Sequence, residues 1–391
     1  MEANVSKYTN AIGSGKQTIT QRQKRKGGRG MREGWEYKKL GEVAIYPNKR
    51  MSLTNISGQQ YVGVETLVKD RGGVAFSEEL PNVDTAIEFL ENDILIGNIR
   101  PYLKKIWKAD RHGASSGDVV NLRIAENFKG RLDSSFLYKV LSSDSFFEYD
   151  NSNTHGAKMP RGDRKAIAEF KIPIPPLSTQ LSIVSELDKI NELIRLKNEQ
   201  LNDYDKLSQS IFYEMFGDPV VNEKGWEVKK FADLYKLKSG DSLSTKNFVE
   251  GEIPVYGGNG ISGYHNDFNM DGDFIIIGRV GVYCGNVREV RGKFWLTDNA
   301  FQLFYSREIQ SPCFIHYLLE ILDLHKYANA AAQPVISNLT LKDVEIIIPP
   351  LSLQQLFAQR IELIKKQKAE IQNTIADLET LLASRMQYWF D

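Results

Sequence analysis

The 391-residue sequence contains only two cysteines, Cys284 and Cys313. Two cysteines are too few for a disulfide scaffold or a cysteine-based zinc site. The sequence also lacks an apolar run of the about 18–20 residues that a membrane-spanning helix needs, and its N-terminus lacks the apolar segment of a secretion signal. We therefore expect a cytoplasmic protein that has no membrane partner, and the length allows two or three domains.

The sequence has no excess of charge of either sign, because 50 Lys and Arg residues balance 50 Asp and Glu residues. A DNA-binding protein of this composition must use local basic patches. One such patch is the polar stretch 1–33, which carries eight basic and two acidic side chains. Because it has no hydrophobic pattern, we predict that residues 1–33 form a disordered basic extension.

Motifs for catalysis are also missing. The five histidines have no metal-ligand spacing, and the sequence contains neither a Gly-x-Ser-x-Gly elbow nor an Asn-Pro-Pro-Tyr motif. Residues 13–16 imitate the end of a phosphate-binding loop, but Gln17 occupies the position that needs Ser or Thr. We therefore predict no catalytic residue, no metal site and no cofactor bound by this chain.

The main positive signal is a long internal repeat. The segment 34–40 (Gly-Trp-Glu-Tyr-Lys-Lys-Leu) returns as 225–231, and 170–178, which contains Pro-Pro-Leu-Ser, returns as 344–352. Gln180 is matched by Gln354 in the same way. The sequences between these anchors are much less alike. Similar borders around different contents indicate one scaffold that is used twice for two different tasks.

A long amphipathic helix is predicted after each Pro-Pro-Leu-Ser segment, because Pro and Ser suit a helix start. Apolar residues then recur at alternating steps of four and three, which is the pattern of a coiled-coil seam. The predicted seam comprises Ile183, Leu187, Ile190, Ile194 and Leu201 in the first helix and Ile361, Ile364, Ile371, Ile375 and Leu378 in the second. Lys197 and Ser208 interrupt the first seam, and Lys368 and Arg385 interrupt the second. We expect the two helices to pair with each other.

This organisation resembles the specificity subunits of Type I restriction–modification systems along nearly all of residues 34–391. The resemblance is carried by Pro-Pro-Leu-x-x-Gln before each helix, by 215–219 (Met-Phe-Gly-Asp-Pro) after the first helix, and by the second Gly-Trp-Glu. Segments 253–264, 273–279 and 294–300 also resemble family segments in the second domain, and 92–100 is a fainter counterpart in the first. Together and in this order, these motifs are specific to the family.

The resemblance implies an α+β fold with an internal pseudo-two-fold repeat, in which two globular target recognition domains are separated by two long helices that form an antiparallel coiled coil. The implied boundaries are 34–176 and 218–350 for the recognition domains, and 177–217 and 351–391 for the spacer helices. The implied partners are double-stranded DNA, two methyltransferase subunits and restriction (translocase) subunits. S-adenosylmethionine would be bound by the methyltransferase, and ATP and Mg²⁺ by the restriction subunit.

Candidate DNA-binding residues come from basic, aromatic and amide side chains in predicted loops. In the first domain they are Arg100, Tyr102, Lys104, Lys105, Lys158 and Arg161, and in the second they are Tyr256, Asn259, Tyr264, Arg279, Gln333, Ser337 and Asn338. Arg279 is predicted to be the counterpart of Arg100, since each follows an apolar strand. The loop 257–263 is read either as a simple turn between strands or as a loop that approaches DNA. The other loops have the same plain alternative, a solvated surface loop or a linker.

Two other functions remain open at this point. A nuclease or another DNA-acting enzyme would use one globular domain for catalysis and the coiled coil for dimerisation. A pure scaffold would have no affinity for DNA, which the divergent contents of the two repeats make less favourable. Non-catalytic recognition of a DNA sequence in two parts is the function that the sequence supports best.

Overall fold

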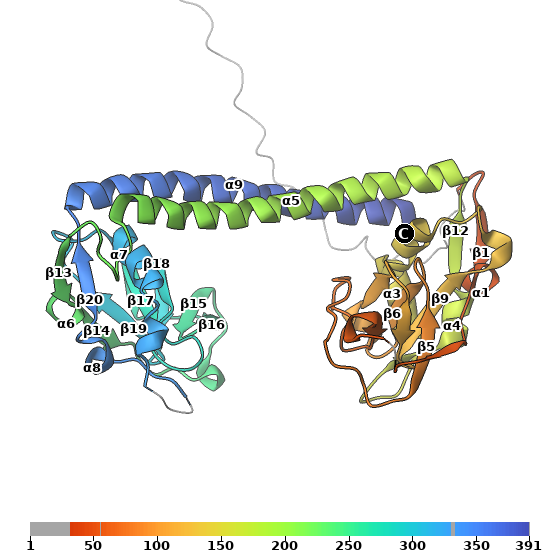
Figure 1. Cartoon of the computed structure of the whole chain (residues 1–391), viewed down its shortest axis with the longest axis horizontal. Helices are drawn as coiled ribbons and strands as arrows, with labels where there is room; N and C mark the ends of the chain where they lie inside the picture. Colours follow the sequence, from red (N-terminus) through yellow and green to blue (C-terminus); the bar gives the residue numbers. More distant parts are fainter. Residues whose placement is uncertain (1–31, 55, 330–332, 391) are drawn as a thin grey trace, which may run out of the picture. The chain divides into compact units, whose positions relative to one another are not determined.

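The computed structural model describes residues 32–54, 56–329 and 333–390. The predicted basic extension, apart from Arg32 and Glu33, lies outside the described residues. The chain divides into two compact units, residues 1–191 with 380–391, and residues 192–379. Each unit contains one globular domain and parts of both long helices (Figure 1). Among the described residues, no helix has the length and apolar character needed to cross a membrane.

The globular domain of the first unit contains two four-stranded sheets. One has the order β2 (Ala44–Ile45), β9 (Val119–Ile124), β6 (Ile94–Gly97) and β7 (Ile106–Lys108). The other has the order β3 (Arg50–Ser52), β5 (Thr85–Phe89), β8 (Gly113–Ser115) and β4 (Tyr61–Val62). Strand β6 is paired on both sides, with β7 and β9, and it is buried along its whole length because Ile94 and Ile96 join one hydrophobic cluster and Leu95 joins another. It carries the main core of this domain.

Short helices cover the core of the first domain. They are α1 (Leu40–Val43), α2 (Ser134–Leu141), α3 (Asp144–Ser152) and α4 (Arg164–Glu169). Asp133 is the N-cap of helix α2, and its side chain accepts a hydrogen bond from the Phe136 amide. The apolar face of α2 is buried over the strands. Two short strand pairs complete the domain, β1 (Glu36–Lys39) with β12 (Lys171–Ile174) and β10 (Thr154–His155) with β11 (Arg161–Gly162).

The globular domain of the second unit is built on one six-stranded sheet. Its order is β14 (Lys236–Ser239), β19 (Ala300–Phe304), β17 (Met270–Gly278), β18 (Val287–Leu296), β15 (Ile253–Gly257) and β16 (Gly260–His265). Ile275 and Ile277 on β17 join the core that α7 (Pro312–Ile321) covers, whereas Ile276 joins a small cluster on the opposite face. This alternation is the two-residue period of a strand. The remaining elements are α6 (Phe231–Leu234), α8 (Asn338–Leu341) and the strand pair β13 (Glu227–Lys230) with β20 (Glu345–Ile348).

The two strand pairs at the borders of the domains repeat each other in register. Glu36 lies opposite Ile174 in β1–β12, and Glu227 lies opposite Ile348 in β13–β20. These are the same positions of the repeat that the sequence relates, since 36 corresponds to 227 and 174 to 348. The predicted internal repeat is therefore present as structure, and the α+β fold class is confirmed.

Each border pair leads into a helix of 40 residues, α5 (Leu177–Phe216) or α9 (Leu351–Phe390). Every predicted seam position is buried or half-buried, including the four that interrupt the apolar pattern. In the second unit, Lys368 pairs with Asp205, and the ring of Phe357 packs 5.7 Å from that of Phe212. Moving forward along α5 therefore means moving backward along α9, so the helices are antiparallel there.

Two of the charged residues that interrupt the seam have partners on the facing helix. Lys368 pairs with Asp205 in the second unit, and Arg385 forms two hydrogen bonds with Glu186 in the first unit. The hydrogen bond from Arg385 holds the pKa of Glu186 below its usual value. A polar pair at a seam position disfavours other registers of the helices, because a slip would bury an unpaired charge.

The end of each long helix completes the core of a globular domain. Phe212 and Phe216, at the end of α5, are fully buried in the core of the second domain. At positions 174 residues later, Met386 and Phe390 at the end of α9 pack on the core of the first domain. The tryptophans of the two Gly-Trp-Glu segments cover these ends. Trp226 donates to the Phe216 carbonyl at 2.8 Å, and Trp35 stacks on Trp389 at 6.3 Å.

Candidate nucleic-acid interface

In the first domain, the loop after β6 is joined to the hairpin β10–β11. The Arg100 amide donates to the Pro160 carbonyl at 2.8 Å, and the Gly162 amide donates to the Asn98 carbonyl at 3.0 Å. Ile99 and Arg161 form an isolated β-bridge between these two bonds. The structure therefore brings together two predicted DNA-binding segments, around Arg100 and around Lys158–Arg161, that are about 60 residues apart in the sequence.

The second domain repeats this arrangement bond by bond. The Gly281 amide donates to the Pro334 carbonyl at 2.9 Å, and the Ile336 amide donates to the Arg279 carbonyl at 3.0 Å. Val280 and Val335 form the bridge between them. We call residues 98–100 with 160–162, and 279–281 with 334–336, the paired-loop frames. When the two frames are aligned by these bonds, Arg279 corresponds to Asn98 and Gly281 corresponds to Arg100. The predicted correspondence of Arg279 with Arg100 is therefore wrong by two positions.

A tight turn follows the frame in the first domain. Arg100 and Lys104 both have left-handed backbone conformations, with φ of 54° and 49°, on either side of the single helical turn 101–103. Such conformations are costly for residues other than glycine and occur preferentially at functional sites. The turn leaves the Tyr102 side chain 51% exposed and the Arg100 residue exposed.

The two lysines of this turn have partners inside the domain. Lys104 lies 2.6 Å from Asp144, and Lys105 donates to the Val64 carbonyl at 2.6 Å. The hydrogen bond from Lys104, with the help of Arg71, holds the pKa of the Asp144 carboxyl below its usual value. The contact of Lys104 holds the turn on the start of α3, and the contact of Lys105 joins it to the segment that follows β4. Whether Lys104 and Lys105 also contact DNA stays a prediction.

The facing hairpin presents a different set of side chains. Lys158 and Arg161 are exposed, and Arg161 forms an ion pair with Asp118 at 3.2 Å. Met159, between them in the chain, is exposed although it is apolar. Long basic side chains beside an exposed apolar one suit a surface that contacts phosphates and base edges.

In the second domain, the glycine-rich turn between β15 and β16 packs directly on the frame. A β-carbon at Gly278 would lie 2.4 Å from the Gly258 carbonyl oxygen, and one at Gly258 would lie 3.0 Å from the Val280 oxygen. Only glycine allows two backbones to approach so closely. The turn is therefore a fixed part of the frame, and it leaves Asn259 exposed at its tip. Tyr264 is exposed further along β16, whereas Tyr256 is half-buried against Phe294.

Sequence reasoning missed two exposed apolar residues beside the frame of this domain. Val282 is 78% exposed and Tyr283 is 49% exposed, in the turn that directly follows the frame residue Gly281. Their signal in the sequence is a pair of apolar residues in a short stretch bounded by Gly281 and Gly285. Apolar side chains in this position suit contact with the methyl group of thymine in the major groove.

Three predicted residues of the second domain have structural partners. Asn338 donates to the Leu237 carbonyl and accepts from the Leu237 amide, which fixes the start of β14. Ser337 accepts from the Thr340 amide and caps α8. Arg279 donates to Ser239 and to the Asp298 carbonyl. Gln333 lies at the edge of the described residues and is exposed. The DNA-binding role of these four residues stays a prediction.

Beneath the frame of the first domain lies an unpaired buried carboxyl. Asp150 is 1% exposed, and neither of its oxygens has a hydrogen-bond partner. A β-carbon at Gly162 would lie 2.4 Å from Asp150 and 2.9 Å from the Asn98 side-chain oxygen, which also lacks a partner. Burial raises the pKa of Asp150 to about 6. The frame of the second domain has Ile336 in place of Gly162, fully buried in the core.

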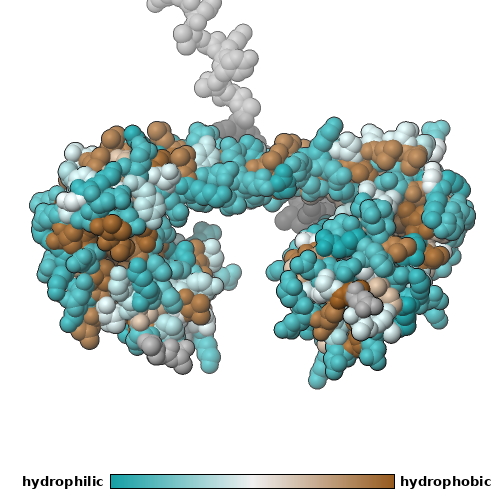
Figure 2. Space-filling model, viewed as in Figure 1, coloured by the Kyte–Doolittle hydropathy of each residue, from teal (hydrophilic) through white to brown (hydrophobic). Residues whose placement is uncertain are grey.

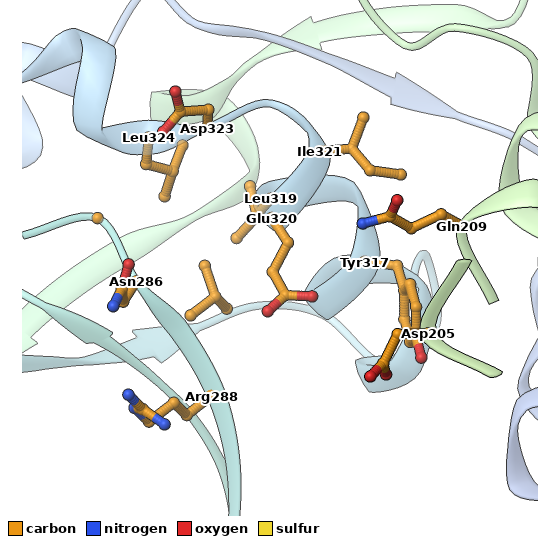
Figure 3. A pocket seen from close by; sticks show the side chains of 12 residues that line it. Asp205, Gln209, Asn286, Arg288, Tyr317, Leu319, Glu320, Ile321, Asp323 and Leu324 are labelled. Carbon is orange, nitrogen blue, oxygen red and sulfur yellow. The ribbon is translucent and has the colours of Figure 1, made fainter. Parts of the chain in front are cut away.

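The second unit also contains a cavity of about 490 Å³ between α5, α7 and the start of β18. Figure 3 shows that Asp205, Glu320 and Asp323 line it together with a single basic side chain, Arg288. This acidic lining disfavours phosphate groups, so the cavity is a poor candidate for DNA contact. Among the described residues, no group of three or more His, Cys, Asp or Glu side chains is placed to hold a metal ion.

A family model described as the Type I restriction modification DNA specificity domain matches residues 32–203 and again residues 223–380. The two matches cover most of the chain, and each contains one paired-loop frame and one border strand pair. The chain belongs to this family. The resemblance inferred from the repeat is therefore confirmed.

Individual relatives support the same assignment. The chain is 27% identical over 249 residues to the specificity subunit of the Type I restriction enzyme EcoprrI from Escherichia coli, which covers 60% of this chain and 61% of that subunit. It is 22% identical over 409 residues to the MjaVIII specificity subunit from Methanocaldococcus jannaschii, which covers 90% of this chain and 92% of that subunit.

Solved structures share the fold. A chain from a study of assembly and conformational transition in the type I R-M system superposes with a TM-score of 0.61 at 19% identity, over 93% of this chain and 99% of that chain. The Type I S subunit from M. genitalium gives a TM-score of 0.55 at 16% identity, over 91% and 96%. Two recognition domains with long helices are thus the fold of this chain.

Membership of the family assigns the class of function. The chain is a DNA-recognition component of a Type I restriction–modification complex, together with modification and restriction subunits, and this component is not catalytic. The alternative of a stand-alone DNA-acting enzyme is not favoured.

Proposed function

We propose that each globular domain of this chain reads one half of a bipartite DNA target, and that the base pairs between the halves are not read. The supporting observation is the pair of paired-loop frames, which have the same backbone bonds and different exposed side chains. The first presents Arg100, Tyr102 and Lys158, and the second presents Val282 and Tyr283. Equal frames with unequal side chains are what two different half-sites require.

The side chains of the two frames suit different parts of the reading task. Arg100, Lys158 and Arg161 carry the charge that phosphate contacts need, and such contacts set register and make affinity depend on salt. Asn259 has an amide that matches the major-groove edge of adenine, and Val282 and Tyr283 offer apolar contact. Each correct base pair then contributes about 1–3 kcal/mol of discrimination.

The long helices provide the surface on which two methyltransferase subunits dock. Several leucines of α5 and α9 in the second unit lie outside the seam and are exposed, and Figure 2 shows hydrophobic residues on the surface of the helices. The exposed leucines are Leu193, Leu196, Leu207, Leu356 and Leu363. Exposed leucines on a paired helix serve neither the seam nor the domain core, so they favour a partner protein.

The chemistry belongs to the partners in this proposal. The methyltransferase subunits bind S-adenosylmethionine and modify adenine, and the restriction subunits bind ATP and Mg²⁺ and translocate and cleave DNA. This chain binds no cofactor and acts in the cytoplasm, where it brings those subunits to the target. Its own contribution is the affinity and the sequence preference of the complex.

The proposal is tested by selecting DNA from a library of random duplexes. The full chain is co-expressed with its cognate methyltransferase subunit, and the retained duplexes are sequenced. We expect a two-part motif with a fixed gap. No enrichment beyond that of the methyltransferase subunit alone would contradict the proposal and favour a scaffold.

A domain exchange separates the two halves of the motif. Replacing residues 225–343 by the second domain of another family member should change one half of the motif and leave the other half unchanged. A change in both halves would show that the two frames do not read independently.

A further inference from the structure

Two fully buried glutamines occupy the same place in the two repeats. Gln180 and Gln354 lie in the first turn of α5 and α9, four residues after the second proline of each Pro-Pro segment, and both are 0% exposed. A buried amide side chain is costly unless its oxygen and nitrogen both find partners. In both repeats all the partners are backbone groups of the globular domain.

The hydrogen bonds of the two glutamines correspond one to one. The Gln180 side-chain oxygen accepts from the Asp133 amide at 2.9 Å, and its nitrogen donates to the Arg131 and Pro175 carbonyls at 2.8 Å each. The Gln354 oxygen accepts from the Ser311 amide at 2.9 Å, and its nitrogen donates to the Ile309 and Pro349 carbonyls at 3.2 and 2.8 Å. We call each set of three bonds the glutamine clamp.

Each clamp joins the spacer helix to the start of a helix inside the domain. Asp133 is the N-cap of α2, and Ser311 is the N-cap of α7. The third bond of each clamp reaches back to the end of the border strand pair, at Pro175 or Pro349. One side chain therefore fixes three backbone segments that meet where the domain adjoins its helix.

Helices α2 and α7 continue this connection from the clamp to the paired-loop frame of each domain. After α2, Asp144 holds Lys104 of the turn that follows the first frame. After α7, His325 lies within 3.0 Å of the Cys284 carbonyl, in the turn that follows the second frame. Each frame is thus linked to the spacer helix of its own unit through one short helix and one glutamine.

We infer that Gln180 and Gln354 are positioning residues, which hold each paired-loop frame at a fixed angle to the spacer helix of its own unit. They thereby set how strictly the protein selects the gap between the half-sites. This inference rests on the proposed bipartite reading. Both glutamines are fully buried and so are out of reach of DNA. Their loss should therefore relax the choice of gap while the bases read within each half-site stay the same.

The test uses the full chain co-expressed with the methyltransferase subunit, carrying Gln354→Leu or Gln180→Leu. Binding is measured on duplexes that hold the recovered motif with its native gap and with gaps one or two base pairs longer or shorter. We expect the preference for the native gap to fall by about tenfold, the factor that corresponds to ~1.4 kcal/mol. Gln355→Leu, at the exposed neighbouring position, is the matched control and should keep the native preference.

The outcomes separate positioning from a purely structural role. Unchanged gap preference in a folded Gln354→Leu variant overturns the inference, and so does a loss of base preference in the second half-site. If Gln354→Leu does not assemble, Gln354→Glu carries the test, because it keeps an acceptor for the Ser311 amide and loses the two donor bonds. Failure of both variants to assemble assigns the clamp to folding alone. Failure of the wild type to recover a two-part motif contradicts the proposed function instead.

Discussion

The two globular domains share a frame and a clamp but differ in what fills them. Both have the same border strand pair, the same three clamp bonds and the same three contacts in the paired-loop frame. In the first domain the frame residue Gly162 lies over the unpaired Asp150, and in the second domain the buried Ile336 stands in place of Gly162. The comparison teaches that the backbone hydrogen bonds define the scaffold, and that the side chains around them differ between the two domains.

The link between domain and spacer helix also differs in its charges. In the first unit, Lys139 on α2 pairs with Asp188 on α5 at 2.6 Å. In the second unit, Glu289 on β18 lies between His316 on α7, at 3.6 Å, and Lys365 on α9, at 2.8 Å. Burial alone would raise the pKa of Glu289, but the two neighbouring cations outweigh burial and hold it at about 2.

The largest expected effect comes from the ends of the long helices. Phe216→Ala should destabilise the second domain by about 3–5 kcal/mol, because it empties a fully buried site. Phe390→Ala, at the matching position, should destabilise only the first domain, and by about half as much, because Phe390 is half-buried. Hydrogen–deuterium exchange resolved by domain checks both. Loss of protection in the other domain would show that the two domain cores are not stabilised independently.

The next effect concerns Asp150. Its pKa in the folded chain, about 6, lies above the usual value of 3.8, so folding favours the protonated form. The loss of stability that ionised Asp150 causes in the first domain is absent below pH 3.8, grows as the pH rises, and is complete above about pH 6. Asp150→Asn should therefore stabilise the first domain by about 2–3 kcal/mol at pH 8 and by little at pH 4. Urea unfolding at both values measures it, with the second domain as the internal control. Equal stability at pH 8 would mean that the carboxylate has a partner.

A smaller effect of opposite sign is expected in the second domain. Burial would lower the pKa of His316, but Glu289 and Glu320 outweigh burial and raise it to about 9. The stability that this raised pKa contributes is complete below pH 6.5 and is lost as the pH rises through 9. We expect the second domain to lose about 1–2 kcal/mol between pH 6.5 and 9.5, less than the full shift would give, because solvent weakens the contact of His316 with the half-exposed Glu320. His316→Gln should remove this dependence. A dependence that persists in the variant would assign it to another group.

The smallest effects concern single contacts to DNA. Lys158→Ala should weaken binding about equally for all sequences and reduce the salt slope by about one, as expected for a lost phosphate contact. Tyr283→Ala should instead alter base preference in the second half-site alone, by about 1–3 kcal/mol at one position. Selection from the random library measures both. A base-specific effect of Lys158→Ala would reverse the roles assigned to the two frames.

Much of the architecture was accessible from the sequence because it depends on periodic patterns. The four-three spacing from Ile183 and from Phe357 predicted both long helices, and their seam positions are buried or half-buried in the structure. The repeated Pro-Pro-Leu-x-x-Gln predicted the two helix starts, at Leu177 and Leu351. The exact domain boundaries and the DNA-binding residues stay predictions, since no DNA or partner tests them.

The residue correspondence between the two paired-loop frames could not be predicted from the sequence. Arg100 and Arg279 each follow an apolar strand, so local pattern equated them, whereas the hydrogen bonds to Pro160 and Pro334 shift the correspondence by two residues. Gln180 and Gln354 were visible as a repeated pair, but not their bonds to the N-caps of α2 and α7. These facts depend on contacts between segments that are tens of residues apart.

The sequence by itself determined the repeat, the two helices and the family, because amphipathic spacing and repeated borders are local properties of the chain. Only the tertiary structure decided which loops form a frame, which glutamine bonds clamp a domain to its helix, and which charge stays unpaired beneath Gly162. The physical reason is that burial and hydrogen bonding are satisfied between distant segments, and one sequence does not show which distant groups will meet.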